Sequence, residues 1–197
     1  MRVFVAVYPP GEIVEDLCSV VDKLALGRAA ANGVNVRLAP RDRLHVTLVF
    51  LGDVPDQRQE DVASAVGLGV DRAAPFPLRL GGGGRFGRGR FTVLWTGLRG
   101  DVDALRDVTA AVRRQMRRAR LPFDAKPLQP HLTIARPGDR VPAEDLAADL
   151  VVLRAYKSPQ WTVEGLRLMR SFPGPTPRYE ELGRWRLTPL TPLTPLT

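Results

Sequence analysis

The chain repeats one order of predicted elements, which is strand, helix, histidine-bearing strand, helix and strand. The two histidine-bearing strands contain His45 and His131, 86 positions apart, and the strands that close each copy begin at Phe76 and Trp161, 85 positions apart. This common offset indicates an internal duplication, and two copies favour two similar lobes over a solenoid, which needs more repeats. The first copy runs through residues 2–8, 11–28, 44–51, 53–66 and 76–80, and the second through residues 91–98, 101–116, 131–135, 142–152 and 161–168.

A pseudo-two-fold pair of lobes places the two histidine-bearing strands opposite each other across a cleft. We therefore expect an α+β protein with one bilobal domain over residues 1–187, its lobes built mainly from residues 1–88 and 89–187. Residues 188–197 repeat Thr-Pro-Leu and are expected to form a low-complexity extended tail. The glycine-rich segment 81–91 lacks the Gly-Lys-Ser/Thr of a phosphate loop, so we predict a flexible connection between strands, with a basic RNA-contacting loop as the alternative.

Both histidines of the chain lie in the pattern His-apolar-Thr-apolar, which reads HVTL in the first copy and HLTI in the second. Side chains alternate between the two faces of a strand, so the histidine and the threonine of each motif share one face. Each lobe then presents an imidazole and a hydroxyl about 7 Å apart along the strand. A lone histidine beside an apolar strand is commonly a core residue, but the duplicated context favours a functional role. The candidate residues are His45, Thr47, His131 and Thr133.

Two matched imidazoles suit the hydrolysis of a phosphodiester without a metal ion. The reaction needs a base to take a proton from water, an acid to give a proton to the leaving oxygen, and donors for the non-bridging oxygens. Imidazoles with a pKa of about 6.5 can divide the first two tasks at neutral pH. The two threonine hydroxyls suit the third task, so the motifs predict two-histidine acid/base catalysis.

The charge of the chain is compatible with this chemistry. Lys and Arg number 29 and Asp and Glu number 21, and the resulting net charge of +8 favours a polyanionic partner such as nucleic acid. One cysteine and two histidines leave few soft ligands, so no metal site is expected. The apolar opening ends at Pro9, which is too early for a signal peptide, and no run is long enough to span a membrane. We therefore expect a cytoplasmic protein without membrane contact.

The segments HVTLVFLG and PHLTIAR, with the opening RVFVAV and the spacing between them, resemble the 2H phosphoesterase superfamily. Within it the chain is similar to the RNA 2',3'-cyclic phosphodiesterases, also called 2'-5' RNA ligases, from about residue 2 to Arg186. The resemblance implies two antiparallel sheets that flank a central cleft with helices outside, and no required metal or nucleotide cofactor. The implied reaction opens a terminal 2',3'-cyclic phosphate on RNA to leave a 2'-phosphate. Some members also catalyse the reverse, ATP-independent 2'-5' joining.

The family motifs match His45 and Thr47 in the first copy and His131 and Thr133 in the second. The resemblance assigns both histidines to catalysis and both threonines to phosphate binding. By analogy His131 is the base for water and His45 is the acid at the leaving 3'-oxygen. Two symmetric imidazoles can nevertheless exchange these roles between the forward and reverse reactions.

Family members commonly carry a phenylalanine five places after the first histidine and an arginine five places after the second, here Phe50 and Arg136. Strict alternation turns both positions to the face opposite the histidines. Arg136 precedes Pro137, so its strand is expected to end there and its long side chain can curl back to bind phosphate. Phe50 needs a bulge to contact substrate, and without one it is a core residue.

Basic residues near predicted strand ends are further candidates for substrate binding. Arg43, Lys126, Arg170 and Arg178 lie in or beside loops next to the motifs, where some would line the entrance and hold RNA phosphates. Another basic group crowds the end of the predicted helix 101–116, where a solvated face is the simpler interpretation because cations favour that end of the helix dipole. This group consists of Arg113, Arg114, Arg117, Arg118 and Arg120.

The sequence thus predicts a monomeric RNA 2',3'-cyclic phosphodiesterase that acts on RNA with 2',3'-cyclic phosphate ends, without an obligate protein partner. Two alternatives stay open. The same site can act on a small cyclic nucleotide or on an ADP-ribose cyclic phosphate. The cleft can also belong to a non-catalytic module that binds RNA ends, although a binding module has no need of two matched titratable groups.

Overall fold

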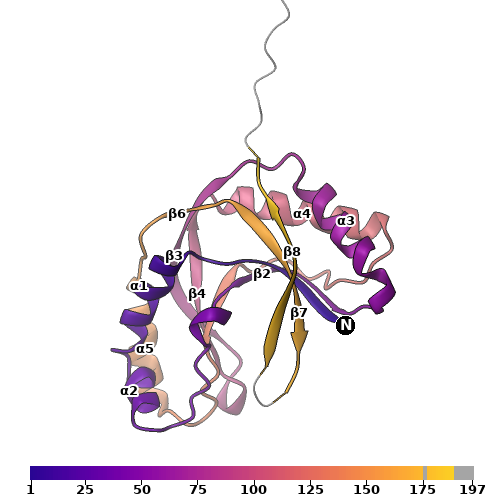
Figure 1. The fold of residues 1–197 in the computed structure, drawn as a ribbon. Helices are drawn as coiled ribbons and strands as arrows, with labels where there is room; N and C mark the ends of the chain where they lie inside the picture. Colours follow the sequence, from indigo (N-terminus) through magenta and orange to yellow (C-terminus); the bar gives the residue numbers. More distant parts are fainter. Residues whose placement is uncertain (175–176, 189–197) are drawn as a thin grey trace, which may run out of the picture.

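The computed structural model describes residues 1–174 and 177–188, and eight strands in this part of the chain form one antiparallel sheet (Figure 1). Their order across the sheet is β6-β3-β4-β5-β2-β1-β7-β8. The strands are β1 (Arg2–Val7), β2 (Val46–Asp53), β3 (Phe76–Phe86), β4 (Val93–Gly100), β5 (His131–Ala135), β6 (Trp161–Val163), β7 (Gly165–Phe172) and β8 (Arg178–Arg186). The α-helices are α1 (Gly11–Val21), α2 (Ala25–Ala31), α3 (Gln59–Val70), α4 (Val102–Arg118) and α5 (Ala143–Ala155).

The strand order is symmetrical about the junction of β5 and β2. Each half of the sheet holds four strands, and the two central strands are β2, which His45 directly precedes, and β5, which begins at His131. The α+β class is confirmed, but the two expected sheets form one curled sheet because Val46 of β2 pairs with Leu132 of β5. In Figure 1, α1, α2 and α5 lie together at one end of this sheet, and α3 and α4 lie together at the other.

The two half-sheets are not assembled from residues 1–88 and 89–187 as expected. β3 comes from the first part of the chain but forms a hairpin with β4, and β7 and β8 return from the second part to the free edge of β1. A short connection keeps successive strands adjacent, so β3 and β4 stay together although they belong to different copies. The helices also cross between the two parts of the chain, because α5 from the second part packs beside α2 from the first. The Asp149 carboxylate of α5 accepts hydrogen bonds from the N–H groups of Ala25 and Leu26 at the start of α2, at 2.7 and 3.0 Å.

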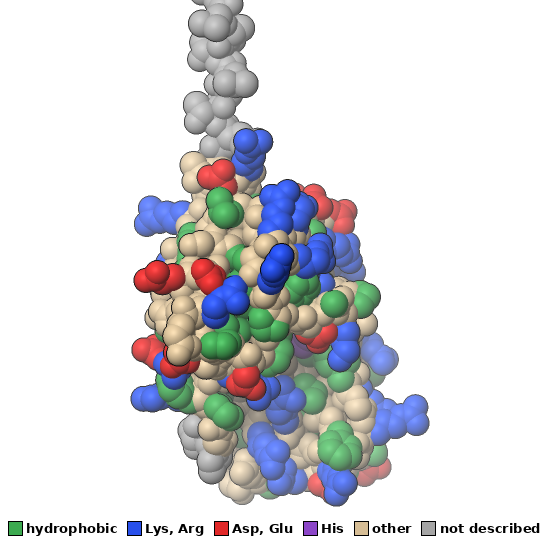
Figure 2. Space-filling view, turned by 90° about the vertical axis from the view of Figure 1, so that its right-hand side faces the viewer, with side chains coloured by type: hydrophobic (Ala, Val, Ile, Leu, Met, Phe, Trp, Pro, Cys, Tyr) green, Lys and Arg blue, Asp and Glu red, His purple; other side chains and the backbone are tan. Residues whose placement is uncertain are grey.

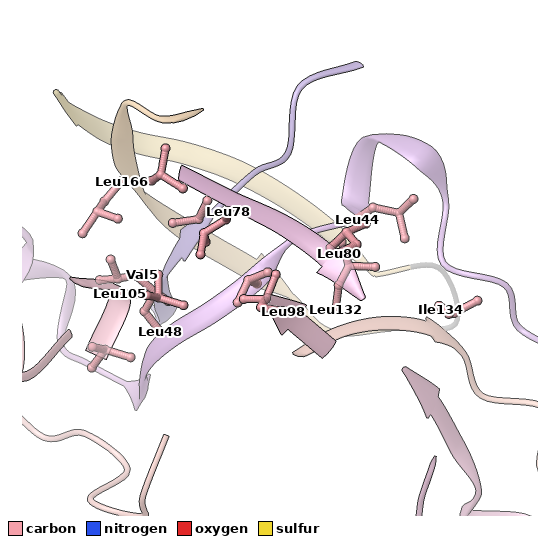
Figure 3. Close-up of a cluster of buried hydrophobic side chains, with 14 of the residues drawn as sticks. Val5, Leu44, Leu48, Leu78, Leu80, Leu98, Leu105, Leu132, Ile134 and Leu166 are labelled. Carbon is pink, nitrogen blue, oxygen red and sulfur yellow. The ribbon is translucent and has the colours of Figure 1, made fainter. Parts of the chain in front are cut away.

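The back face of the sheet, defined by the β1 residues Val3, Val5 and Val7, carries the main hydrophobic core. Figure 3 shows part of this core, where Val5 and Leu48 of the sheet gather near Leu105 of α4. The buried stripe of α4 has the helical spacing expected from the sequence. It consists of Leu105, Val108, Val112 and Met116 together with Thr109.

The front face is the opposite side of the sheet, and it carries a smaller cluster of apolar and aromatic side chains. Phe4 and Ala6 alternate with the back-face valines of β1, and Met169 of β7 lies opposite Phe4. Because β1 is buried on both faces from Val3 to Val7, this stretch is apolar without interruption and does not reveal which residues face the site. The cluster consists of Phe4, Ala6 and Met169, with Tyr8, Phe50 and Tyr179 packed against them.

The glycine-rich segment 81–91 is not a flexible connection, because β3 continues through it as far as Phe86. The glycines permit close packing instead. A Cβ atom at Gly83 would lie 2.4 Å from Cβ of Leu153 on α5, and one at Gly84 would lie 2.2 Å from the indole ring of Trp95. Only a residue without a side chain fits at these two positions, so the glycines let α5 and Trp95 approach the strand.

The C-terminal part of the sheet also differs from the expectation. The predicted strand 161–168 is divided into β6 and β7, and β8 follows as a strand that the sequence did not predict. Most β8 side chains are partly or fully exposed, so the strand lacks the alternation of apolar residues that identifies strands in a sequence. Apart from Thr188, the predicted tail lies outside the described residues. Within the two described ranges, no helix is long and apolar enough to cross a membrane.

Candidate active site

The central strands β2 and β5 bring the two histidine motifs together. The second residue of one motif pairs with the second residue of the other in antiparallel register. His45 directly precedes β2 and His131 begins β5, and continuing this register by one residue in each direction places His45 across from Thr133 and His131 across from Thr47. Directly opposite Cβ atoms on such a pair are about 5 Å apart, and diagonal ones are about 7–8 Å apart. On this register the two imidazoles occupy a diagonal, with a threonine hydroxyl across from each.

The backbone fixes both imidazole rings in the same way. Nδ1 of His45 lies 2.6 Å from the carbonyl oxygen of Arg43, and Nδ1 of His131 lies 2.7 Å from the carbonyl oxygen of Gln129. A carbonyl oxygen can only accept a hydrogen bond, so Nδ1 carries the proton in each ring. The Nε2 atom is then the one that can accept or release a proton, and it lies on the side of the ring away from this backbone contact.

A β-bulge follows the threonine of the first motif. Thr47 and Val49 pair with successive residues of β1, which leaves Leu48 as an extra residue. Leu48 and Val49 are consequently both buried, and Phe50 returns to the front face, where it packs with the cluster around Phe4. The alternation expected for Phe50 is therefore interrupted, and the residue lies on the same face as the histidine.

The second motif contains the same bulge. Thr133 and Ala135 pair with successive residues of β4, which leaves Ile134 as the extra residue. Ile134 and Ala135 are both buried, while Arg136 is exposed at the end of the strand. The backbone N–H of Arg136 donates to the carbonyl oxygen of Arg37 at 3.1 Å, which holds the chain in place after the bulge. The sequence suggested that the Arg136 side chain curls back past the strand end. In the structure, the bulge at Ile134 instead returns Arg136 to the same face as His131.

His45 lies in an aromatic environment on the front face. Its ring stacks on Phe4 and Tyr8, with centroids 4.9 and 5.3 Å away, and meets the edge of Tyr179 at 5.5 Å. Burial lowers the pKa of His45 below 6.5, the hydrogen bond to the backbone partly opposes this shift, and the charge of His131 lowers the pKa further. The lowered pKa favours the neutral imidazole of His45, whose Nε2 carries no proton.

His131 has a different set of neighbours, although its strand context is the same. Phe86 of β3 lies edge-on to the ring at 4.9 Å, and Trp95 of β4 lies 6.3 Å away. The residue that pairs with His131 on β4 is Gly97. The corresponding place beside His45 is taken by the stacked ring of Tyr8, so the two halves of the site are not equivalent.

The comparisons agree with this arrangement of the fold. Residues 13–172 match the family described as the 2'-5' RNA ligase superfamily. The chain belongs to this superfamily.

The same superfamily supplies relatives along most of the chain. A Thermus thermophilus protein named RNA 2',3'-cyclic phosphodiesterase is 32% identical over 188 residues, covering 87% of this chain and 82% of that one. A Geobacillus stearothermophilus protein of the same name is 36% identical over 93 residues, but the match spans only 47% of this chain and 29% of that one. The crystal structure of Escherichia coli LigT complexed with ATP has a TM-score of 0.71 and 26% identity, covering 95% of this chain and 98% of that one.

Tyr8 and Arg167 are members of the site that the sequence did not predict. The Arg167 guanidinium lies 4.7 Å from the centre of the Tyr8 ring, and it is 3.3 Å from the Glu181 carboxylate. The Tyr8 hydroxyl is buried without a hydrogen-bond partner among the described residues, and burial raises the pKa of Tyr8 to about 12. A neutral, unpaired hydroxyl beside His45 is therefore available to a bound molecule. The sequence held one signal for Tyr8: the alternation that turns Phe4 and Ala6 to the front face continues to Tyr8.

Two of the predicted basic residues lie next to the histidine motifs in the chain. Arg43 ends the short 3₁₀ helix Arg41–Arg43, and its guanidinium donates to the carbonyl oxygen of Pro177. Lys126 is exposed in the loop that leads to β5, with Nζ 3.8 Å from the Asp124 carboxylate. Arg43 is therefore tied to a distant part of the chain, whereas Lys126 only approaches a neighbour in its own loop. Neither side chain has a hydrogen bond or ion pair to an imidazole among the described residues.

The other two predicted basic residues lie around Phe172, at the far end of the β7–β8 hairpin. The guanidinium groups of Arg170 and Arg178 are 4.8 and 4.6 Å from the centre of the Phe172 ring. Arg170 pairs with the back-face residue Val3, and it approaches the Asp56 carboxylate to 3.7 Å. Alternation thus turns Arg170 away from the histidines, and the structure does not bring this pair to the site.

Seen from outside, the site is recessed. Figure 2 shows histidine at the centre of this surface, partly hidden among hydrophobic side chains and with basic side chains above and below. Among the described residues, no group of three or more His, Cys, Asp or Glu side chains is placed to hold a metal ion. The chemically active groups described on the front face include two imidazoles, two aliphatic hydroxyls, the phenols of Tyr8 and Tyr179 and the Arg167 guanidinium.

Proposed function

We propose that this protein opens terminal 2',3'-cyclic phosphates of RNA to leave 2'-phosphomonoesters, by metal-independent catalysis through His45 and His131. The same site would also support the reverse, ATP-independent 2'-5' joining. The enzyme class is RNA 2',3'-cyclic phosphodiesterase within the 2H phosphoesterases, in line with the family and with relatives named for that activity. The observation that carries the proposal is the diagonal pair of imidazoles, each oriented by a backbone carbonyl and each opposite a threonine of the other motif.

In the proposed hydrolysis, His45 is assigned as the base because its lowered pKa favours the neutral form that a base requires. Its Nε2 takes a proton from water while the water oxygen forms a bond to phosphorus. The bond between phosphorus and the 3'-oxygen breaks, and protonated His131 gives its Nε2 proton to that oxygen. The products are a 2'-phosphate and a 3'-hydroxyl. This division of roles is opposite to the one implied by the family resemblance, and the roles exchange in the reverse reaction.

The phosphate would be held by groups on the two central strands. The hydroxyls of Thr47 and Thr133 can donate to the non-bridging oxygens, and the Arg136 guanidinium supplies positive charge from the end of β5. Phe50, returned to the front face by the bulge, would contact the nucleoside part of the substrate. We further propose that residues 1–187 act as one unit, since both half-sheets contribute to the same phosphate site. The proposal also takes this unit to be monomeric and cytoplasmic.

The deciding experiment is product analysis with a defined oligoribonucleotide that ends in a 2',3'-cyclic phosphate, in the presence of excess EDTA. The proposal expects a product with a 2'-phosphate. His45→Ala and His131→Ala should each lower the rate about 10²–10⁴-fold while the circular dichroism spectrum and the melting temperature stay close to those of the unmodified protein. Full activity in either folded variant would overturn the two-histidine mechanism.

The same assay separates the proposal from its alternatives. A 3'-phosphate product would reverse the regiochemistry, and binding without turnover would identify a module that only recognises RNA ends. Comparison of the oligoribonucleotide with a 2',3'-cyclic mononucleotide and an ADP-ribose cyclic phosphate tests the substrate class. A kcat/KM that is highest for the oligoribonucleotide and falls with added salt supports RNA as the substrate.

A further inference from the structure

Helix α4 carries arginines on two flanks, and the surroundings of these flanks differ. On one flank, α4 and the loop before β5 form a groove of about 400 Å³ that has no acidic residue in its lining. On the other flank, α4 and α3 border a hollow of about 780 Å³ whose arginines share the lining with Asp71, Asp101 and Asp107. The groove is lined by Arg106, Thr109, Ala110, Arg113, Arg117, Pro127 and Leu128.

The arginines of the groove have little competition for an anion. Arg113 and Arg117 take part in none of the ion pairs found among the described residues, and the Nε atom of Arg113 is buried without a hydrogen-bond partner. Arg106 is paired with Asp103 at 2.7 Å, but both side chains are more than half exposed, and such a pair contributes little to stability. Arg113 and Arg117 thus bring positive charge to the groove that no acidic side chain pairs with in the described part of the chain, and Arg106 adds a weakly paired guanidinium.

The groove is connected to the candidate active site through the loop that forms its second wall. Nη1 of Arg113 donates to the carbonyl oxygen of Lys126 at 2.9 Å, which ties this loop to α4. The N–H of Asp124 in the same loop donates to the carbonyl oxygen of Phe50 on β2 at 2.8 Å. Leu128 is three residues before His131, so their Cα atoms are at most about 11 Å apart. The loop thus joins the groove to the histidine-bearing strand β5, and an RNA chain bound at the histidines would pass over this loop to contact α4, which lies on the back of the sheet.

We propose that this groove binds the sugar-phosphate backbone of the RNA substrate, next to the nucleotide whose cyclic phosphate reacts. The inference rests on the proposed function and adds a second contact region to it. Arg106 and Arg117 would bind phosphates, and the apolar surface of Pro127 and Leu128 would contact the sugar or base between them. The solvated face expected from the sequence holds for the opposite flank of α4, where Arg114 and Arg118 lie among carboxylates.

The test compares two double variants that remove the same charge from the same helix. Arg106→Gln with Arg117→Gln alters the groove, and Arg114→Gln with Arg118→Gln is the matched control on the other flank. Each is assayed with a 2',3'-cyclic mononucleotide and with an oligoribonucleotide that ends in a 2',3'-cyclic phosphate. Arg113 is left in place because its hydrogen bond to Lys126 supports the loop before His131.

For the groove variant we expect kcat/KM with the oligoribonucleotide to fall roughly tenfold, and the slope of log kcat/KM against log salt to become shallower by about 1.4, or about 0.7 for each lost phosphate contact. Activity with the mononucleotide and both activities of the control variant should stay unchanged. Equal losses with both substrates, or equal losses in both double variants, would overturn the proposal, as would no loss at all.

A binding measurement keeps this test independent of turnover. His131→Ala alone, and combined with each pair of arginine substitutions, is titrated with a fluorescent oligoribonucleotide that ends in a 2',3'-cyclic phosphate. Weaker binding confined to the groove combination supports the groove even where no hydrolysis is found, whereas absence of hydrolysis in the unmodified protein counts against the proposed function. Equal affinity of the two combinations would overturn the groove proposal in either case.

Discussion

Val46 lies opposite Leu132 at the centre of the sheet, and this pair sets the register of the two histidine motifs. The side-chain period of a strand is two residues, so a slip by one residue would turn the histidine of one strand to the back face. Both residues of the pair are fully buried on that face. The main core on the back of the sheet therefore holds the position of the imidazoles on the front.

This register gives each imidazole a threonine hydroxyl on the opposite strand, and it leads to a first prediction. Thr47→Val or Thr133→Val removes one hydroxyl at nearly constant volume and should lower kcat on a 2',3'-cyclic phosphate about 10²-fold, because a donor to the developing phosphate charge is lost. Thr→Ser at the same positions keeps the hydroxyl and should recover most of the rate. Steady-state kinetics of the four variants provide the check, and valine variants as active as the serine variants would exclude the threonines from phosphate binding.

The environment of His45 predicts the acid side of the pH-rate profile. The neutral form is the base, and burial lowers the pKa of His45, so its activity should persist below pH 6.5. The acid limb of kcat/KM reports this group in the free enzyme and should have its midpoint below the ordinary value of about 6.5. A profile measured with a cyclic mononucleotide, whose phosphate does not titrate in this range, gives the midpoint directly. A midpoint above about 6.5 would contradict His45 as the neutral base.

The same shift predicts how folding stability depends on pH. An unfolded histidine has a pKa of about 6.5 and binds more protons than His45 does in the folded protein. The contribution of His45 to stability is therefore fully present above about pH 6.5 and is lost as the pH falls toward its lower folded value. Urea unfolding between pH 7.5 and pH 5 should show a smaller loss of stability in His45→Gln than in the unmodified protein. Equal losses in the two proteins would mean that His45 is not desolvated.

Most strands and the stripe of α4 could be predicted from the sequence because their apolar residues follow a regular period. The pairing of strands could not be predicted in this way. The apolar residues of β3 are compatible with pairing to a strand of its own copy and equally with pairing to β4, which the structure shows. The bulges could not be predicted either, because Leu48 and Val49 are two successive apolar residues and only the pairing with β1 identifies Leu48 as the extra one. The sequence left open whether Phe50 contacts substrate or belongs to the core, and only the structure places it on the front face.

The histidines and threonines could be identified because the same four-residue pattern occurs twice with a common offset. The aromatic surroundings of His45 were hidden for the opposite reason. Phe4 lies in β1, which is apolar on both faces, and Tyr8 directly follows this strand. Arg167 and Tyr179 come from the hairpin at the other end of the chain. Contacts of this kind depend on the final strand order, which no local pattern specifies.

The glycines of β3 provide a prediction about stability. Gly84→Ala places a methyl group where the Trp95 ring lies and should destabilise the fold by about 1–3 kcal/mol, since the ring or the strand must move. Gly11→Ala is the matched control, because a Cβ there meets no atom within 4 Å. Thermal or urea unfolding of both variants provides the check. If Gly84→Ala were as stable as Gly11→Ala, the glycine-rich segment would be the flexible connection that the sequence suggested.

The bulge in β5 makes Arg136 the subject of the last prediction. Without the extra residue Ile134, Arg136 would alternate to the back face, where a charged side chain has no place in the core. With it, Arg136 ends the strand on the histidine side, so Arg136→Ala should lower kcat/KM for a cyclic phosphate about 10-fold or more through loss of a charge-assisted hydrogen bond. Arg136→Lys should recover part of this loss, because lysine keeps the charge but not the planar fork. Arg140→Ala is the control, since Arg140 is exposed in the loop that follows. Equal activity of Arg136→Ala and Arg140→Ala would show that the bulge positions the strand end without a role for the arginine in phosphate binding.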